Sequence, residues 1–453
     1  MGETQVGLAW RRVRILTRLA GLVAAVVLAA GVLPWPWAPM IVPAASPFVM
    51  IASVIALRAA GVAVLAGFPV LVAALRRPRW FCRWVCPVGL AEEALGRVRP
   101  SAARRFVKWP AVGQWIALLT LGGAAAGYPL LVWLDPLAML EGFVGAWRWP
   151  LTPASLAAAV GLPAVLVFSA VFPHAWCARV CPLGAVQDLL AWPRQWLRRR
   201  GAVGTSPPAA DAGWHGHVPL RGRDACGQGE DRHAVVGQQG HATAWPRHPP
   251  HEKARRGTSW VLARRTFLAA GMGGACGVAV RAVRGGSVTP ALRPPGAIDE
   301  ARFTGVCVRC GNCVRACPSR IIRPDLGKHG LAGLLTPVLN FDEDCCREDC
   351  RACTEVCPSG AIARLTLEEK RRFVIGEARV DLGTCLLAKG QECTACTRAC
   401  PYDAVETPRS ADGSAIEPRV DALKCTGCGA CEAVCPTSPE KAVRVYATSP
   451  RCA

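Results

Sequence analysis

Sixteen of the 24 cysteines in this 453-residue chain fall into four short runs between residues 307 and 436. The first and fourth runs read Cys-x2-Cys-x2-Cys-x3-Cys-Pro, the second Cys-x3-Cys-x2-Cys-x3-Cys-Pro and the third Cys-x7-Cys-x2-Cys-x3-Cys-Pro. Three closely spaced thiolates can bind three irons of a [4Fe–4S] cubane, while the fourth, beside proline, binds the neighbouring cubane. Structural zinc sites favour CxxC pairs separated by longer loops, so the runs indicate iron–sulfur clusters instead. The predicted ligands are Cys307, Cys310, Cys313, Cys317, Cys346, Cys350, Cys353, Cys357, Cys385, Cys393, Cys396, Cys400, Cys425, Cys428, Cys431 and Cys435.

The exchange of the fourth cysteine requires the runs to pair, and we expect an outer pair and an inner pair. In this arrangement Cys435 completes the first cubane and Cys317 completes the fourth. Within the inner pair, Cys400 completes the second cubane and Cys357 completes the third. The prediction is four [4Fe–4S] clusters that move single electrons.

One ligand of the second run has an alternative. Cys345 directly precedes Cys346, so either thiol could bind the cluster.

A second set of thiols lies in the N-terminal part. Cys82 and Cys86 form one Cys-x3-Cys-Pro-x-Gly motif, and Cys177 and Cys181 repeat it 95 residues later. The two pairs could jointly bind a metal, form a redox-active dithiol, or be structural thiols in helix-capping turns.

The elements that carry these motifs are predicted to be membrane helices. Residues 1–200 hold 20 Lys and Arg against 6 Asp and Glu, a net charge of +14, and contain apolar stretches at about 15–35, 59–75, 111–134 and 154–172. Only Arg58 and Arg148 fall in the loops placed outside, so the positive-inside rule puts the N-terminus and both motifs in the cytoplasm. We expect an all-α four-helix transmembrane domain in the lipid bilayer and no nucleic-acid binding.

The rest of the chain divides into three parts. Residues 201–260 are rich in Gly, Pro, Ala and His without periodicity, which predicts a disordered linker. Residues 261–284 carry Arg264 and Arg265 before Thr-Phe-Leu and a mild apolar run, which is typical of a twin-arginine export signal and could form a fifth span. An ordinary basic linker before a short helix is the alternative. Residues 285–453 form the polyferredoxin domain.

Short strand-like pieces precede the later runs at 338–341, 378–381 and 419–421 and follow them at 361–362, 404–405 and 442–443, which predicts an α+β ferredoxin-like domain. The apolar residues Ile321, Ile362, Val405 and Val443 are expected in its core, where they exclude water from the cubanes. The chain has no c-type haem motif, no dinucleotide fingerprint and no P-loop. We therefore predict no catalytic residue for a small substrate.

Two family resemblances follow from these motifs. Residues 10–190, with four spans and the duplicated Cys-x3-Cys-Pro, resemble the NapH-type membrane ferredoxin of periplasmic nitrate reductase systems. Residues 263–447, with Arg-Arg-x-Phe-Leu and four cluster motifs, resemble the exported NapG-type polyferredoxin and the methylamine-utilisation (MauM) ferredoxins. The membrane half lacks the cytoplasmic ferredoxin tail of the NapH type, and the second run has an unusual spacing.

The resemblance implies the electron-transfer component of a quinol dehydrogenase-type system in the bacterial inner membrane. Electrons would come from the membrane quinone pool and leave from a periplasmic ferredoxin domain to a reductase or cytochrome. Two alternatives stay open. The chain could be a redox-sensing or maturation factor for a periplasmic metalloenzyme, or its ferredoxin domain could stay in the cytoplasm if the twin-arginine segment is unused.

Overall fold

The computed structural model describes residues 3–61, 63–98, 110–147, 153–201, 258–287, 291–408 and 417–448. The chain divides into two compact units, Met1–Trp192 with Thr266–Ala453, and Pro193–Arg265. The predicted linker at 201–260 lies almost entirely outside the described residues, as do the side chains of Arg264 and Arg265. The fold below is that of the first unit.

The N-terminal part is a helical bundle, as its long apolar stretches predict. Its longer helices are α1 (Glu3–Ala29), α4 (Ala63–Arg76), α6 (Pro87–Val98), α7 (Val112–Ala125), α9 (Pro153–Ala159), α10 (Gly161–Val171) and α11 (Pro182–Gly201). Within the described ranges, one stretch alone is long and apolar enough to cross a membrane by itself, Thr266–Val283 of α12 (Thr258–Ser287). A pair of helices bent by 90°, Ala38–Ala44 and Pro47–Leu57, could count as a second. The four-span arrangement therefore stays a prediction.

The two loops that separate the predicted spans fold into the bundle as short helices. The first loop contains η1 (Ala38–Met40), α2 (Ile41–Ala44) and α3 (Pro47–Leu57), and the second contains η3 (Val132–Leu134) and α8 (Pro136–Ala146). Ser46 caps α3 and Asp135 caps α8, and the Ser46 hydroxyl donates to the Asp135 carboxylate at 2.5 Å. Both caps are fully buried, so this hydrogen bond joins the two helix starts inside the core.

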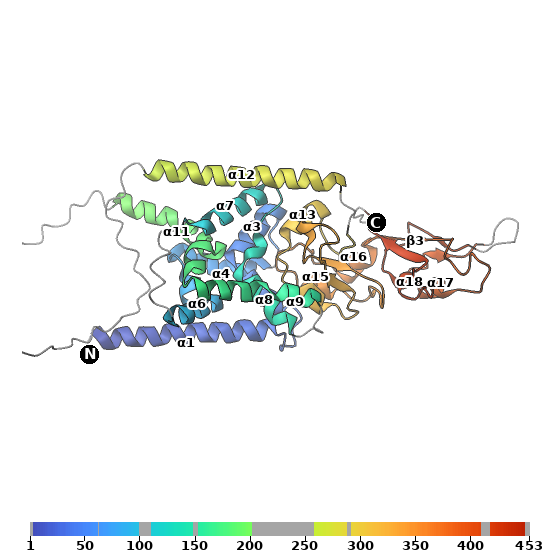
Figure 1. The fold of residues 1–453 in the computed structure, drawn as a ribbon, viewed down its shortest axis with the longest axis horizontal. Coiled ribbons are helices and arrows are strands. Elements are labelled where there is room, and N and C mark those ends of the chain that lie inside the picture. Colours follow the sequence, from blue (N-terminus) through green and yellow to red (C-terminus); the bar gives the residue numbers. More distant parts are fainter. Residues whose placement is uncertain are drawn as a thin grey trace, which may run out of the picture. The chain divides into compact units, whose positions relative to one another are not determined.

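The helix α12 packs on α7 through glycine residues (Figure 1). A Cβ atom at Gly273 would overlap the carbonyl oxygen of Leu119, and one at Gly122 would overlap that of Ala270. Arg281 extends the contact by donating to the Ala126 carbonyl at 2.8 Å. Close backbone approach through small residues is the usual way in which helices pack in membranes.

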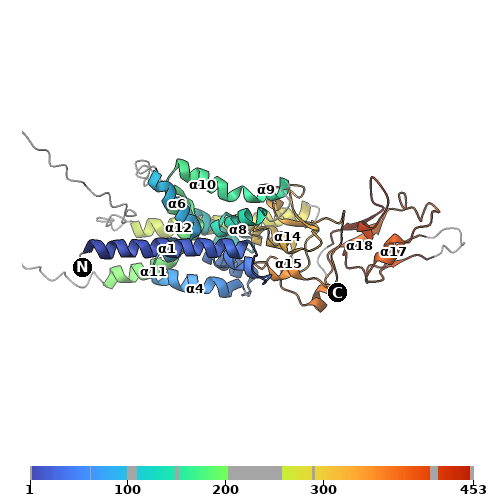
Figure 2. The same ribbon diagram turned by 90° about the horizontal axis from the view of Figure 1, so that it is seen from below.

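The cysteine runs lie in a region of short helices and two-stranded sheets (Figure 2). Its elements are α13 (Glu300–Val306), α14 (Asn312–Ala316), β1 (Ile322–Pro324), η5 (Leu331–Gly333), β2 (Pro337–Leu339), α15 (Ala352–Glu355), α16 (Leu367–Arg372), β3 (Glu377–Val380), α17 (Ala395–Ala399), β4 (Val405–Glu406), β5 (Arg419–Val420), α18 (Ala430–Ala433) and β6 (Val443–Tyr446). The strands pair antiparallel as β1–β2, β3–β6 and β4–β5. The predicted strand at 361–362 forms only an isolated bridge between Ala297 and Ile362, and β1 was not predicted.

The predicted core residues Ile321, Ile362, Val405 and Val443 are all buried. Ile362 belongs to a core that also contains Phe303 and most of the helical bundle. The other three belong to a second core around the later cysteine runs. The start of the cubane region therefore shares its core with the bundle.

Candidate iron–sulfur sites

The triplet of the first run lines a cavity with the fourth cysteine of the second run. The residues are Cys307, Cys310, Cys313 and Cys357. The expectation that Cys435 completes this site is wrong. The fourth cysteine does cross to a neighbouring cluster, but the neighbour is the next run in sequence.

The second cavity shows the reciprocal exchange, because Cys317 joins the triplet Cys346, Cys350 and Cys353. Cys345 also borders this cavity. Both thiols interact electrostatically with Lys370, but the Cys346 thiol also interacts with Cys317 and Cys350 of this site, whereas the Cys345 thiol also interacts with Asp344 and Arg347. The geometry therefore favours Cys346 as the ligand.

The last two runs form the same kind of pair. The triplet Cys425, Cys428 and Cys431 lines a cavity with Cys400, the fourth cysteine of the third run. In the third run, Cys396 interacts electrostatically with Cys385 and Cys393. By reciprocity we expect Cys435 to complete the site of the third run. The predicted pairing of the second run with the third run is wrong.

Strand pairing explains why the runs pair in sequence order. The bridge Ala297–Ile362 joins the segment before the first run to the segment after the second run. The pair β3–β6 joins the segment before the third run to the segment after the fourth run. The pair β1–β2 lies between the first and second runs, and β4–β5 lies between the third and fourth runs. Each pair of runs is thus closed by its own outer and inner strand pairs.

The donor sets fit cubanes. The Cys357 sulfur accepts the backbone N–H of Ile362 at 3.4 Å, and the Cys400 sulfur accepts that of Ala404 at 3.3 Å. Burial raises the pKa of Cys307 to about 11 and that of Cys346 to about 12, so without iron these thiols hold their protons. Iron binding displaces those protons, and the positive charge of the iron then stabilises the buried thiolates.

No three Cys, His, Asp or Glu side chains in the described part of the chain are placed to hold a single metal ion. A cubane binds each cysteine through a different iron atom, so its ligands surround a volume instead of converging on one point. The thiols line a shared cavity at each site, as the ligands of a cubane must.

The second and third cavities are joined directly. The backbone N–H of Cys346 donates to the carbonyl oxygen of Cys428 at 2.8 Å. Tyr402, which lines the third cavity, interacts electrostatically with both cysteines, and burial raises its pKa to about 12. Its phenol therefore remains neutral. The three cavities therefore connect in the order of the first, second and fourth runs, and the third run adjoins the last of them through Cys400.

The first cavity meets the helical bundle. Ala158 of α9 is part of the cavity wall, beside Cys310. Arg315, which lies between two cysteines of the first run, forms an ion pair with Glu141 of α8. Glu141 is fully buried, and the Arg315 side chain is 13% exposed. This long-range pair connects residues 174 positions apart and could not be read from the sequence.

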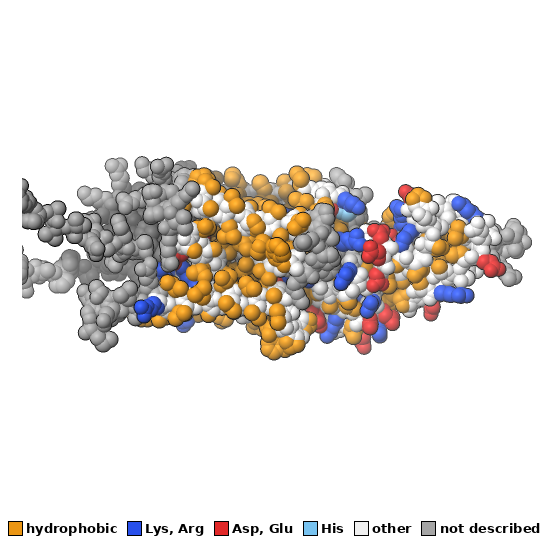
Figure 3. All heavy atoms as spheres, turned by 60° about the horizontal axis from the view of Figure 1, so that its bottom comes forward, with side chains coloured by type: hydrophobic (Ala, Val, Ile, Leu, Met, Phe, Trp, Pro, Cys, Tyr) orange, Lys and Arg blue, Asp and Glu red, His pale blue; other side chains and the backbone are white. Residues whose placement is uncertain are grey.

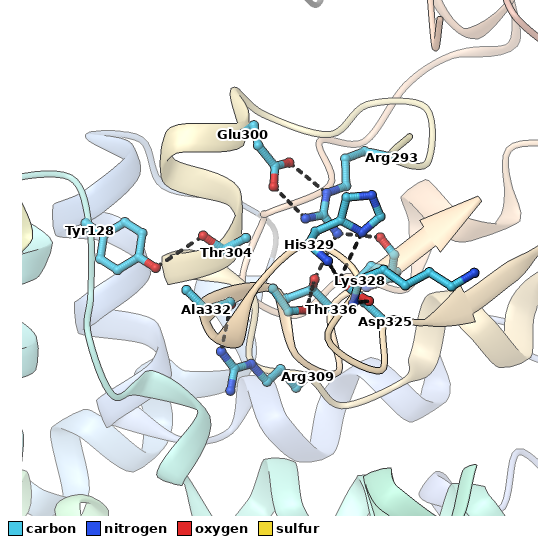
Figure 4. Close-up of polar contacts among 12 residues, drawn as sticks. Tyr128, Arg293, Glu300, Thr304, Arg309, Asp325, Lys328, His329, Ala332 and Thr336 are labelled. Carbon is cyan, nitrogen blue, oxygen red and sulfur yellow. Dashed lines mark hydrogen bonds and ion pairs between the residues drawn. The ribbon is translucent and has the colours of Figure 1, made fainter. Parts of the chain in front are cut away.

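Further contacts hold the same junction (Figure 4). The hydroxyl groups of Tyr128 and Thr304 are hydrogen-bonded at 3.2 Å. The Arg309 guanidinium lies over the Trp133 ring at 5.0 Å and donates to the Ala332 carbonyl at 3.1 Å. These contacts fix the first cysteine run against the bundle.

The loop that accepts the Arg309 hydrogen bond is itself ordered by a buried carboxylate. Asp325 accepts backbone N–H groups from Gly327, Lys328 and His329 at 2.9–3.1 Å (Figure 4). Arg293 supports the neighbouring turn through Glu300 and the Thr336 hydroxyl. The Asp-x-Gly sequence is a recognisable turn signal, but it does not predict that the turn contacts Arg309 at this junction.

The four bundle cysteines are also brought together. The Cys177 thiol interacts electrostatically with Cys181, Cys86 and Cys82, and Cys181 interacts with Cys82 and Cys86. Joint metal binding by the two pairs is one of the alternatives that the sequence leaves open, and the structure places the thiols of the two motifs near one another.

Comparison with known proteins agrees with the two kinds of site. A 4Fe-4S dicluster domain model matches residues 306–361 and 389–438, which contain the two pairs of runs except for Cys385. A 4Fe-4S binding domain model matches residues 59–108 and 154–200, which contain the two Cys-x3-Cys motifs. No solved structure matches significantly.

Curated relatives decide the family. The methylamine utilization ferredoxin-type protein MauM of Methylobacillus flagellatus is 34% identical over 190 residues, 41% of this chain and 80% of that protein. The ferredoxin-type protein NapG of Escherichia coli K12 is 36% identical over 194 residues, 41% of this chain and 82% of that protein. The chain belongs to the NapG/MauM family of ferredoxin-type proteins. Escherichia coli NapF is also similar, at 32% identity over 157 residues, 34% of this chain and 87% of that protein.

Membership of the NapG/MauM family establishes the polyferredoxin character of the chain and its role in electron transfer. Each of these two relatives matches 41% of the chain.

Proposed function

We propose that this chain is a membrane-anchored iron–sulfur protein that passes electrons from membrane quinol through four [4Fe–4S] clusters to a periplasmic reductase. The observation that carries the proposal is the junction between the bundle and the first cysteine run. A helix of the bundle contributes Ala158 to the wall of the first cavity, and Glu141 pairs with Arg315 beside that cavity. A donor bound at the bundle would meet this site first.

Surface composition supports a bundle in contact with lipid. Hydrophobic side chains gather over the bundle in Figure 3, whereas charged side chains gather over the cubane region. Exposed apolar residues of the bundle include Leu65, Val167 and Phe267, which are 73%, 65% and 79% exposed. An apolar surface of this kind is unusual on a soluble monomer and is normal for a helix that faces lipid.

The order of the cavities defines a route for electrons from the bundle to the far end of the cubane region. Oxidation of a quinol releases two electrons and two protons, whereas each cubane accepts one electron. The order of the cavities makes the third run, with Cys385, Cys393 and Cys396, the last site before an acceptor. The short backbone link between Cys346 and Cys428 joins the two halves of this route.

The helix α12 suits a retained anchor. Its glycines Gly273 and Gly277 face the glycines of α7, so the helix is docked on the bundle by close backbone contact. We infer that the twin-arginine segment at its start directs export of the cubane region, and that α12 remains in the membrane as a fifth span. Reporter fusions after Pro290 test this topology, because a cytoplasmic signal would contradict it.

Anaerobic mixing with a reduced quinol tests the function. Purified, detergent-solubilised protein should contain at least the sixteen or so irons of four cubanes, and quinol should bleach their visible absorbance at a catalytically useful rate. A full iron content with unchanged colour would reject quinol oxidation by this chain. Slow reduction without turnover would favour the redox-sensing or maturation role instead.

A further inference from the structure

A groove on the surface of the bundle is large enough for an organic ligand. It runs along α4 to the start of α5 (Trp80–Trp84), and its volume is about 460 Å³. The cavities between the cubane cysteines measure only 10–30 Å³. Pockets for small molecules typically measure about 300–1,000 Å³, so the groove has room for a substituted aromatic ring. The helix α4 lies at the edge of the bundle in Figure 2.

The lining of the groove changes from apolar to cationic along α4. Phe68, Pro69 and Val72 form its first part, and the Phe68 side chain is 56% exposed. Arg76 and Arg77 line the groove about one turn beyond Val72, and both are exposed. In the predicted orientation, the apolar part lies among lipid tails and the arginines lie at the cytoplasmic headgroups. The groove therefore suits an amphipathic ligand with an apolar tail and a polar head.

The sequence of α4 explains why a groove forms here. Pro69 lies inside the helix, where it has no N–H to donate to the carbonyl of Leu65. On the next turn, Ala73 contributes only a methyl group to the lining. A proline and an alanine on neighbouring turns leave space that larger side chains would fill.

Trp80 ends the groove next to the bundle cysteines. Its ring is partly buried and packs against the core that contains Phe81 and Cys86. Cys82 follows two positions later in the same short helix, a rise of about 3 Å. The 4Fe-4S binding domain model covers this motif and its repeat, which assigns an iron–sulfur centre to the bundle cysteines. A ligand in the groove would therefore lie beside a redox centre.

The cationic end of the groove is held against the second cysteine motif. Arg79 turns inward, where it forms an ion pair with Asp188 at 2.6 Å and donates to the Cys177 carbonyl at 3.0 Å. Arg76 and Arg77 line the groove instead. Nearby positive charge favours the anionic form of an oxygen ligand. The groove thus offers an aromatic ring and two cations at the end that adjoins the thiols.

We propose that this groove is the binding site for membrane quinol, which deepens the proposed function and rests on it. The quinol ring lies beside Trp80, its hydroxyl groups lie at the arginine end, and its tail follows Phe68 into the lipid. Oxidation breaks the two O–H bonds and forms two C=O bonds. The two protons pass to water at the arginine end, and the two electrons leave one at a time for the iron–sulfur centre of the bundle.

An anionic phospholipid is the competing ligand, because its headgroup would also bind the arginines. The position of Trp80 next to Cys82 favours quinol, since only a redox-active ligand makes use of a neighbouring electron acceptor. A flat aromatic ring is also the natural partner of an indole ring.

Photolabelling of purified, detergent-solubilised full-length protein identifies the site without turnover. The probes are short-chain azido derivatives of ubiquinone and of menaquinone. Peptide mass spectrometry should place the label of at least one probe within residues 68–80, and an excess of the unlabelled quinone should abolish it. Labels only elsewhere in the chain, or a label removed by phosphatidylglycerol but not by quinone, would overturn the proposal.

A variant that fills the groove tests the same site by function. Ala73→Trp should reduce both the labelling and the rate of bleaching at low quinol concentration about tenfold, because the added ring occupies the space of the ligand. The matched control is Leu75→Trp on the same helix, whose side chain is 44% exposed and lies outside the lining. Equal behaviour of the two variants would contradict the site.

A milder variant covers the case in which Ala73→Trp does not fold. Phe68→Ala truncates an exposed side chain and should weaken quinone binding about threefold to tenfold, through the loss of one aromatic contact. Its iron content should equal that of wild type. Unchanged quinone binding by Phe68→Ala would count against the groove.

These measurements separate the site from the proposed function. Bleaching by quinol together with labels only outside residues 68–80 would reject the groove and keep quinol oxidation. A label within residues 68–80 without bleaching would keep the groove as a quinone site and reject quinol oxidation by this chain.

Discussion

Replacing Glu141 by glutamine keeps the size of the side chain and removes its charge at the junction between the bundle and the first cubane. Glu141 is fully buried and its partner Arg315 is 13% exposed, so the variant leaves the guanidinium without its counter-ion in a largely desolvated place. Removal of one partner from a buried ion pair typically destabilises by about 3–5 kcal/mol. Arg315 keeps hydrogen bonds to Asn312 and to the Cys310 carbonyl, so we expect a loss of about 3 kcal/mol.

The same variant should change one reduction potential. The Glu141 carboxylate interacts electrostatically with Cys310, a ligand of the first site. A unit charge that acts over about 10 Å at an effective dielectric constant of about 20 contributes roughly 2 kcal/mol, and we take this value for the loss of the carboxylate charge. For a one-electron couple this raises the potential of the first cubane by roughly 80 mV, because the reduced cluster is no longer repelled.

Potentiometric EPR titration of the purified protein measures the shift, and denaturant unfolding measures the stability. The control is Glu440→Gln, whose side chain is 73% exposed and pairs only loosely with Arg444 at 3.8 Å. We expect the control to leave the stability and the first potential unchanged. If Glu141→Gln also changed neither, or if it shifted all components equally, the assigned position of Glu141 beside the first cubane would be refuted.

Three further predictions follow from the same contacts. Cys357→Ser should remove about four irons and abolish the potential shift caused by Glu141→Gln, because Cys357 completes the first site. Iron analysis and EPR measure these two effects. A potential shift that persisted in the double variant would favour the pairing of the first run with the fourth. Gly273→Leu should detach α12 from α7 and lower the thermal midpoint in detergent, whereas Gly271→Leu, which meets no atom within 4 Å, should not; equal effects would contradict the docked helix. Thr366→Ala removes the hydroxyl that accepts the Glu369 backbone N–H in a capping box at the start of α16, while the bond from the backbone N–H of residue 366 to Glu369 remains. The variant should destabilise the cubane region by about 1 kcal/mol in denaturant unfolding, with unchanged stability as the contrary result.

The cluster ligands could be predicted from the sequence because spacing along the chain carries most of the information, and the structure gathers cysteines of these runs around shared cavities. Three cysteines within seven positions can reach one cubane whatever the rest of the fold does. The choice of partner for Cys317 or Cys357 is different, because it depends on which distant strands pair. The bridge between Ala297 and Ile362 and the unpredicted strand β1 decided this, and both are too short to leave a periodic pattern.

The bundle shows a similar division. Apolar composition predicted helices near the right positions, and the repeated motif left open whether the four thiols form one site. The two loops that the sequence placed on the outer side of the membrane form the largely buried helices α3 and α8. Their burial depends on the hydrogen bond between Ser46 and Asp135, and the junction with the cubanes depends on the pair Glu141–Arg315. Such pairs join residues far apart in sequence and have no local signature.

The most direct test of the proposed route is stopped-flow reduction of the full-length protein by a reduced quinol in two variants that each remove one end of the cubane chain. Cys357→Ser should remove the cubane beside the bundle, and Cys435→Ser the one at the far end. The account predicts that quinol rapidly bleaches the remaining cubanes of Cys435→Ser but leaves those of Cys357→Ser oxidised. Equal rates of bleaching in the two variants would contradict entry through the first site.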